Sequence, residues 1–221
     1  MKNLTILLIA TGLLFNSCKN WNKTQKGGAI GAGTGAVAGG VIAKLAHKNT
    51  IIGAIIGAAV GGAAGAVIGH YMDKQAEEIQ KDIQGAKVER IGEGIKITFD
   101  SGILFDLNSS SLKPVASENI LKLAKVLNKY SDTDVLIEGH TDNTGEDKYN
   151  EELSVKRADA VSNYVKMQGI KGARITTVGY GEKQPLQGNE TEQGRAQNRR
   201  VEVAIMANKK LKKAAKKGEI K

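Results

Sequence analysis

Residues 139–158 read GHTDNTGEDKYNEELSVKRA and lead from a strand end through a polar loop into a helix. Residues 134–139 (DVLIEG) contain the apolar run Val135 to Ile137, with two β-branched residues, and predict the strand. Apolar residues recur at helical spacing over 149–168, and Gly169 follows as a helix terminator. The stretch therefore predicts a strand, loop and helix unit at the centre of a folded domain.

Two charged residues of this unit raise a functional question. Arg157 lies four residues after Leu153 and four before Val161, so it emerges from the packing side of the helix and needs a carboxylate partner. Asp142, in the loop, is one candidate, and the two would then form a structural ion pair. A ligand carboxylate is the other candidate. A ligand with a carboxylate and an ammonium on one carbon would place the carboxylate on Arg157 and the ammonium on Asp142.

The flanking sequence extends the domain to residues 86–207. One or two strands are expected within 94–106 and a helix over 115–129 after Pro114. Further strands are expected over 174–179 and 200–207. In the last strand we expect Val201, Val203 and Ile205 to point inward and Arg200, Glu202 and Ala204 outward. This order predicts an α/β (α+β) two-layer sandwich with a mixed sheet and helices on one face.

Four motifs of the domain occur together: GHTDNTG at 139–145, NEELSVKRA at 150–158, GYGEKQP at 179–185 and GRAQNRRVEV at 194–203. Over residues 95–207 the chain resembles the OmpA-like peptidoglycan-binding domain family, shared by OmpA-type porins, peptidoglycan-associated lipoproteins and flagellar stator proteins. The resemblance implies non-covalent binding of the diaminopimelate residue of peptidoglycan stem peptides. That residue ends in a carboxylate and an ammonium on one carbon.

The resemblance also implies roles for single residues. Asp142 would take the ammonium, Arg157 the carboxylate, and Asn108, Thr144, Asn150 and Arg199 would be further ligand contacts. For Asn150, a helix N-cap is the alternative interpretation. Phe105, Leu153 and Gly179 are interpreted as fold residues, and His140 as a residue that holds the loop rather than a metal ligand.

The N-terminus has the features of an export signal. Residues 1–17 contain Lys2 and an apolar run from Leu4 to Phe15, which predict a signal peptide. Cys18 follows directly and resembles the lipidated cysteine of bacterial lipoproteins, so residues 18–26 would be a lipidated linker. The alternative is an ordinary signal with an incidental cysteine.

Residues 27–72 are rich in glycine at four-residue spacing. These glycines are Gly27, Gly31, Gly35 and Gly39 in the first half and Gly53, Gly57, Gly61, Gly65 and Gly69 in the second. Residues four apart share a helix face, so the pattern predicts a helical hairpin of two glycine-zipper helices. The second helix, over 51–69, has no charge and would suffice to enter a membrane; a hairpin lying against a membrane or another protein is the alternative.

The formal net charge of +9 is unevenly distributed. Residues 85–207 carry 17 Lys and Arg against 18 Asp and Glu, whereas residues 208–221 carry seven lysines and one glutamate. We expect a charged linker helix over 73–85 and a Lys-rich tail over 208–221 that is solvated or lies at a membrane surface. The tail has no aromatic residue for base stacking, so no nucleic-acid partner is expected.

The sequence therefore predicts a non-catalytic protein, without metal or cofactor, that tethers the outer membrane to peptidoglycan. Its expected location is the outer membrane, lipid-anchored through Cys18 and facing the periplasm, with residues 27–70 as a possible second membrane contact. The alternative is a membrane-embedded glycine-zipper homo-oligomer, a pore or scaffold, with the wall domain as its tether.

Overall fold

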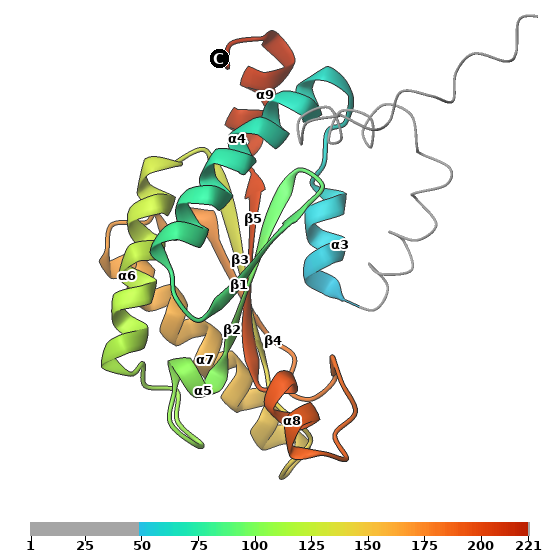
Figure 1. Cartoon of the computed structure of the whole chain (residues 1–221), viewed down its shortest axis with the longest axis vertical. Helices are drawn as coiled ribbons and strands as arrows, with labels where there is room; N and C mark the ends of the chain where they lie inside the picture. The colour runs from blue at the N-terminus through green and yellow to red at the C-terminus, as the bar shows by residue number, and fades with distance from the viewer. Residues whose placement is uncertain (1–48, 221) are drawn as a thin grey trace, which may run out of the picture.

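The computed structural model describes residues 49–220, which form a mixed five-stranded sheet with helices packed around it (Figure 1). The strand order is β1-β2-β5-β3-β4, and β3 and β4 are the parallel pair. The bounds are Ala86–Ile91 for β1, Gly94–Asp100 for β2, Thr133–His140 for β3, Ile175–Gly179 for β4 and Arg200–Ala207 for β5. The predicted α/β class with a mixed sheet is confirmed.

The central strand β5 determines which loops meet. It lies between β2 and β3 and is antiparallel to both. Val201, Val203 and Ile205 are fully buried in the main core, as the alternation predicts. His140, the last residue of β3, pairs with Arg200, the first residue of β5. The loop after β3 and the segment before β5 are therefore neighbours at one end of the sheet.

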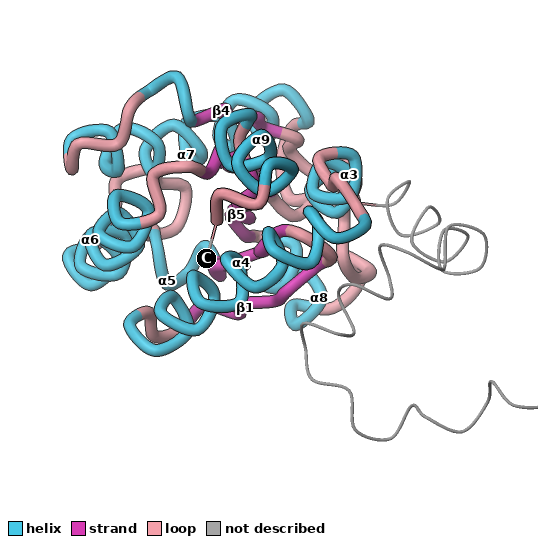
Figure 2. Tube along the Cα trace, turned by 90° about the horizontal axis from the view of Figure 1, so that it is seen from above, coloured by secondary structure: helices cyan, strands magenta, loops and turns pink. Residues whose placement is uncertain are grey.

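Three long helices pack around the main core: α4 (Gly62–Asp82), α6 (Pro114–Lys129) and α7 (Asp147–Met167). Figure 2 shows them from above, together with the strands that they cover. The remaining short elements are α5 (Ser101–Leu104), the 3₁₀ helix η1 (Gly172–Arg174) and α8 (Glu192–Asn198). Pro114 occupies the first turn of α6, where its fixed φ and missing N–H suit a helix start.

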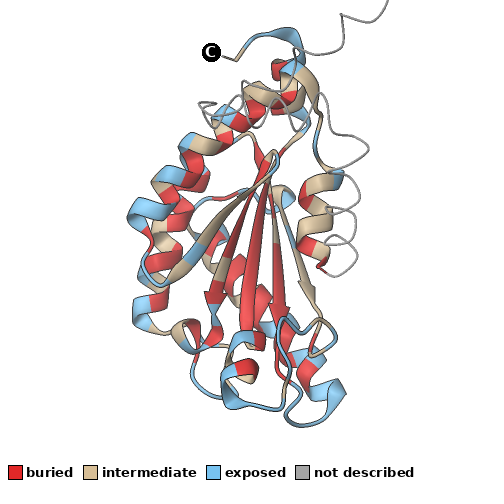
Figure 3. Cartoon of the chain, turned by 45° about the vertical axis from the view of Figure 1, so that its right-hand side comes forward, coloured by how far each residue is buried: buried red, intermediate tan, exposed pale blue. Residues whose placement is uncertain are grey.

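The second face of the sheet is covered in part, which the sequence did not predict. Helix α3 (Thr50–Gly57) lies there (Figure 3). Its buried Ile51 and Ile55 pack on Ala204 of β5. Arg200 and Glu202 also point to this face, yet each is no more than 1% exposed. Strand alternation gives the direction of a side chain, but what covers that face depends on the distant segment before α4.

The expected single helix over 51–69 is wrong, because α3 ends at Gly57 and α4 begins at Gly62. Gly61 and Gly62 both have positive φ, 73° and 62°, a conformation that glycine adopts readily. The freed N–H groups of Val60 and Gly61 donate to the Glu93 carboxylate at 2.8 and 2.6 Å. Glu93, in the β1–β2 turn, therefore stabilises the break between the two helices, and the spacing of glycines in the sequence could not reveal this.

The expected boundary between the zipper and a separate linker helix at 72/73 is also absent. Helix α4 runs through it, because its buried stripe continues over Ile68, Met72, Ala76 and Ile79. The predicted signal peptide, Cys18 and the first half of the predicted zipper lie outside the described residues. Within residues 49–220, no helix combines the length and the apolar character that crossing a membrane requires.

The Lys-rich tail is folded rather than solvated throughout. Residues Lys209–Lys217 form α9, which packs on α4 through buried Leu211 and Ala215. These two residues are four apart and share one face, whereas the lysines occupy the others. Asn208 caps the helix by accepting a hydrogen bond from the Leu211 N–H at 2.9 Å, and Gly218 ends it with φ 70°.

Replacing Asn208 with alanine tests this docked helix. We expect the free energy of unfolding to fall by about 1 kcal/mol, because the Leu211 N–H loses its side-chain acceptor. Urea denaturation measures the change. Asn163→Ala, at an exposed position inside α7, is the control and should be neutral or slightly stabilising. An Asn208→Ala value equal to that control would contradict a capped, docked α9.

Candidate functional site

All six residues expected to contact a ligand line one pocket of about 470 Å³ at the carboxyl end of β3. Its walls come from the loop before α6, the loop after β3, the first turns of α7, and α8 with the residue that follows it. The predicted members are Asn108, Asp142, Thr144, Asn150, Arg157 and Arg199. Six further lining residues were not predicted as contacts: Leu107, Thr141, Tyr149, Leu153, Glu192 and Arg195.

Three of the sequence motifs meet behind this pocket. The Thr141 N–H donates to the Gly181 carbonyl at 2.9 Å, and the Gly181 N–H donates to Ser154 Oγ at 2.9 Å. Gly139 is packed so closely on α7 that a Cβ there would collide with the Ser154 carbonyl oxygen. These contacts hold the loop that carries Asp142 against the helix that carries Arg157.

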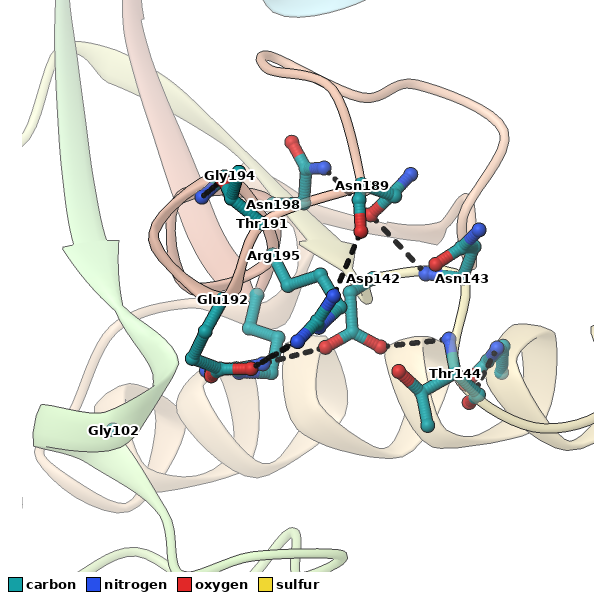
Figure 4. Close-up of polar contacts among 12 residues, drawn as sticks. Gly102, Asp142, Asn143, Thr144, Asn189, Thr191, Glu192, Gly194, Arg195 and Asn198 are labelled. Carbon is teal, nitrogen blue, oxygen red and sulfur yellow. Dashed lines mark hydrogen bonds and ion pairs between the residues drawn. The ribbon is translucent and has the colours of Figure 1, made fainter.

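Asp142 is held from both sides (Figure 4). Its Oδ1 accepts the Thr144 N–H at 2.9 Å, and its Oδ2 accepts from Arg199 Nη1 at 2.6 Å. Burial raises the pKa of Asp142, but the hydrogen bonds from Arg199 and Thr144 outweigh burial, and the net pKa is lower than usual. With this lowered pKa, Asp142 is ionised at neutral pH. Each carboxylate oxygen has two lone pairs, so Asp142 can accept a hydrogen bond from a further donor in the pocket.

Arg199 connects Asp142 to α8. Its Nη2 donates to Glu192 Oε1 at 2.6 Å, and Arg195 donates to Glu192 Oε2 at 2.8 Å. Burial lowers the pKa of Arg199, but the two carboxylates outweigh it and raise the pKa above its ordinary value. Arg199 was expected to be a flanking contact; the structure makes it the ion-pair partner of Asp142.

Arg157 has no carboxylate partner among residues 49–220, so the structural Asp142–Arg157 pair is wrong. Its Nε donates to the Ser109 carbonyl at 3.0 Å, and its guanidinium lies 5.3 Å from the centre of the Phe105 ring. Only 4% of Arg157 is exposed, and burial lowers its pKa, although an arginine stays charged at neutral pH. The described residues give its two Nη atoms no hydrogen bond, which leaves a charged fork at the pocket.

The remaining predicted contacts differ in how they are held. Asn108 is exposed and is the one non-glycine residue within 49–220 with positive φ, 55°. Asn150 is buried and donates to the Thr144 carbonyl at 3.2 Å and to the Glu182 carboxylate at 2.9 Å. The N-cap alternative for Asn150 is wrong, because α7 begins at Asp147 after its cap residue Glu146. Asn150 thus fixes the loop, and a ligand contact would be an additional role.

A second polar cluster lies on the α3 face of the sheet, where Glu138, His140 and Glu202 are all buried. Lys96 Nζ and Arg200 Nε lie 2.9 and 3.0 Å from Glu202 Oε1 and supply the positive charge there. His140 stacks on Tyr180, and its pKa is lowered chiefly by burial. The sequence interpretation of His140 as a loop-holding residue did not anticipate these two buried carboxylates beside it.

Residues 104–199 match the family model described as the OmpA family, a segment that contains all six predicted contacts. This segment belongs to the OmpA family. Residues 1–73 match a second model, the YMGG-like Gly-zipper. Both matches confirm the resemblance drawn from the sequence motifs, and neither model describes a catalytic family.

Relatives of this chain include lipoproteins and porins. The probable lipoprotein YiaD of Escherichia coli is 39% identical over 138 residues, 62% of this chain and 63% of that protein. Outer membrane porin F of Pseudomonas aeruginosa is 40% identical over 121 residues, 54% of this chain and 34% of the porin. The chain thus spans less than two thirds of either relative.

Two solved structures share the fold. A MotB-like protein from Desulfovibrio vulgaris has a TM-score of 0.59 and 25% identity, with coverage of 66% of this chain and 96% of that one. The cell wall anchor of the T6SS from Pseudomonas aeruginosa has a TM-score of 0.54 and 29% identity, with coverage of 62% and 97%.

Proposed function

We propose that the chain is a non-catalytic envelope protein that tethers the outer membrane to peptidoglycan by binding the diaminopimelate residue of the stem peptide. One observation carries the proposal: a single pocket presents the ionised Asp142 carboxylate and an Arg157 guanidinium that has no carboxylate partner among residues 49–220. OmpA-family membership and the likeness to a cell wall anchor support the choice of ligand.

The chemistry of each group suits one end of such a ligand. The two Nη atoms of Arg157 form a planar fork that can bind a carboxylate through two hydrogen bonds. Asp142 keeps lone pairs free for an ammonium, and its pair with Arg199 fixes its orientation. Thr144 and Asn108 are exposed at the rim, where they can donate to the peptide. Asn150 and Arg199 would act mainly by positioning the Asp142 loop.

The outer-membrane side of the tether rests on Cys18. Acyl chains on that cysteine would hold the protein to the bilayer, with the pocket facing the periplasm. YiaD, which is named as a lipoprotein, and porin F, which is named as an outer membrane protein, support this location. Many tethered copies on one polymeric wall would gain avidity from modest single-site affinity.

Cosedimentation of the full chain with diaminopimelate-containing peptidoglycan tests the proposal. Free diaminopimelate should displace the protein. Nα-acetyl-lysine amide, which keeps the side-chain ammonium but has no carboxylate, should displace it poorly. The full chain is preferable to residues 86–207, because α3, α4 and α9 all pack against the sheet. Equal displacement by both compounds would show that Arg157 reads no carboxylate.

A second candidate function is a glycine-zipper oligomer, which the Gly-zipper match over residues 1–73 favours. Gly57→Leu probes it cleanly, because Gly57 is exposed and a Cβ there meets nothing within 4 Å. Gly61 is a poorer choice, since its positive φ would strain any other residue. A crosslinked oligomer that Gly57→Leu abolishes would favour this function; crosslinking that the substitution leaves unchanged would count against it.

A further inference from the structure

The outer surface of α9 is strongly basic. The helix contains six lysines and no acid, and Leu211 and Ala215 turn toward α4. Two lysines have carboxylate partners, Lys210 with Asp132 at 3.1 Å and Lys217 with Glu219 at 3.4 Å. The other four have no ion pair within residues 49–220: Lys209, Lys212, Lys213 and Lys216. We call all six lysines of α9, the two paired and the four others, the lysine face.

The lysine face borders an uncharged surface. Helix α9 packs on α4, and the chain from Thr50 to Gly69, which includes the first turns of α4, contains no charged residue. Ala59 and Ala63 are exposed there, and none of the large exposed hydrophobic residues of the described chain belongs to this stretch. A ligand at this end of the molecule would therefore be bound mainly through the lysine charges. The small apolar side chains beside the lysine face carry no charge that must be desolvated when a bilayer approaches.

The lysine face lies at the opposite end of β5 from the candidate site. Arg199 precedes β5 and lines the pocket, whereas Asn208 follows β5 and caps α9. Eight strand residues separate them, so they are nine residue steps and roughly 30 Å apart at the usual rise of an antiparallel strand. Figure 1 shows α9 at one end of the molecule and α8 at the other.

We propose that the lysine face binds the anionic surface of a phospholipid bilayer. Four to eight lysines on one amphipathic helix match anionic lipid headgroups in charge and spacing, and α9 is already folded and anchored for the purpose. A nucleic acid fits less well, because α9 has no aromatic residue for stacking and residues 85–207 carry a net charge of −1. Only the opposed orientation of bilayer and wall rests on the proposed function; the lipid contact itself does not.

Vesicle binding of the full chain tests this inference, with Cys18→Ser throughout so that no acyl chain dominates. Vesicles of neutral phosphatidylcholine are compared with vesicles that contain phosphatidylglycerol. Lys213→Gln/Lys216→Gln should bind the anionic vesicles roughly 25-fold more weakly, about fivefold for each lysine, and the neutral vesicles unchanged. The matched control is Lys125→Gln/Lys166→Gln, which removes two exposed lysines from α6 and α7 and should bind as the parent does.

A second readout guards against misfolding and saturation. Acetylation of the parent on anionic vesicles should spare Lys213 and Lys216 while Lys125 and Lys166 react as in solution. Equal loss in both double variants, or equal labelling of all four lysines, would overturn the inference. Tighter binding to duplex DNA than to anionic vesicles would assign the face to nucleic acid instead. No peptidoglycan is present, so failure here is distinct from failure of the wall-binding proposal.

Discussion

Replacing Arg157 with alanine is expected to weaken binding of the full chain to peptidoglycan by at least about 30-fold. Arg157 is the pocket's one buried cation without a carboxylate partner within residues 49–220, so its loss removes the only expected bidentate contact to the ligand carboxylate. Truncating one partner of a buried, hydrogen-bonded charge pair costs about 2–5 kcal/mol. The affinity of Arg157→Lys for peptidoglycan should lie between those of the parent and Arg157→Ala, because an ammonium keeps the charge but lacks the planar fork.

Arg174→Ala is the matched control for this experiment. Arg174 is also a partly buried arginine, but it donates to the carbonyls of Leu127, Tyr130 and Thr133, far from the pocket. The Arg174→Ala substitution should lower the melting temperature and leave the affinity of the folded protein for peptidoglycan unchanged. Arg157→Ala that binds the wall as tightly as Arg174→Ala would remove Arg157 from the binding site.

Glu202→Gln is expected to lower the free energy of unfolding by about 3–5 kcal/mol. Glu202 is fully buried and is the anion between Lys96 and Arg200, which are themselves 6% and 1% exposed. The amide would leave two buried cations with less negative charge nearby than they need. Urea denaturation of the full chain measures the loss. Glu89→Gln, which breaks an exposed pair with Lys87, is the control and should cost less than about 1 kcal/mol.

The pH dependence identifies the cause. Burial raises the pKa of Glu202, but Arg200 and Lys96 outweigh burial and lower the pKa below its ordinary value. A carboxylate with a lowered folded-state pKa stabilises the protein above its unfolded pKa and loses that contribution as the pH falls through the folded value. The parent should therefore lose stability on acidification, and Glu202→Gln should lose less. If Glu202→Gln had the same free energy of unfolding as the parent, and lost as much of it on acidification, Glu202 would not be the stabilising anion between Lys96 and Arg200.

The pocket could be predicted well from the sequence because its residues belong to local motifs. Asp142, Thr144, Asn150 and Arg157 lie within one strand, loop and helix unit, whose geometry follows from hydrophobic periodicity and a short connection. Asn108 lies before this unit in the chain, and Arg199 lies after it in the GRAQNRRVEV motif. The pairing of Asp142 with Arg199 could not be predicted, since it depends on the insertion of β5 between β2 and β3.

The segments at both ends of the described chain were harder to interpret, because their partners are distant in sequence. An uncharged glycine-rich stretch is compatible with a membrane, another helix or a sheet face, and α3 occupies the sheet face. Leu211 and Ala215 give α9 a narrow apolar stripe, which its seven-lysine context concealed. The burial of Arg200 and Glu202 likewise depends on residues outside β5. Gln184 accepts a hydrogen bond from Arg200, and Asn49, just before α3, donates to Glu202.

The docked α3 would give a wall tether a defined mechanical response. Tension between the bilayer and the pocket would enter the described chain at Asn49, just before α3, and α3 is not part of the sheet. Two isoleucines pack α3 on the sheet, and Asn49 and Thr50 bond Glu202, Glu138 and Gln184. The loop after α3 is held by the hydrogen bonds of Val60 and Gly61 to Glu93. Peeling α3 and the following loop up to Gly61 would release 13 residues.

Those residues would extend the tether by up to roughly 45 Å at the reach of an extended chain. The five strands and the pocket would stay folded meanwhile, so the grip on the wall would survive the stretch. A sudden swelling of the gap between membrane and wall would then be absorbed as slack before it loads the binding site.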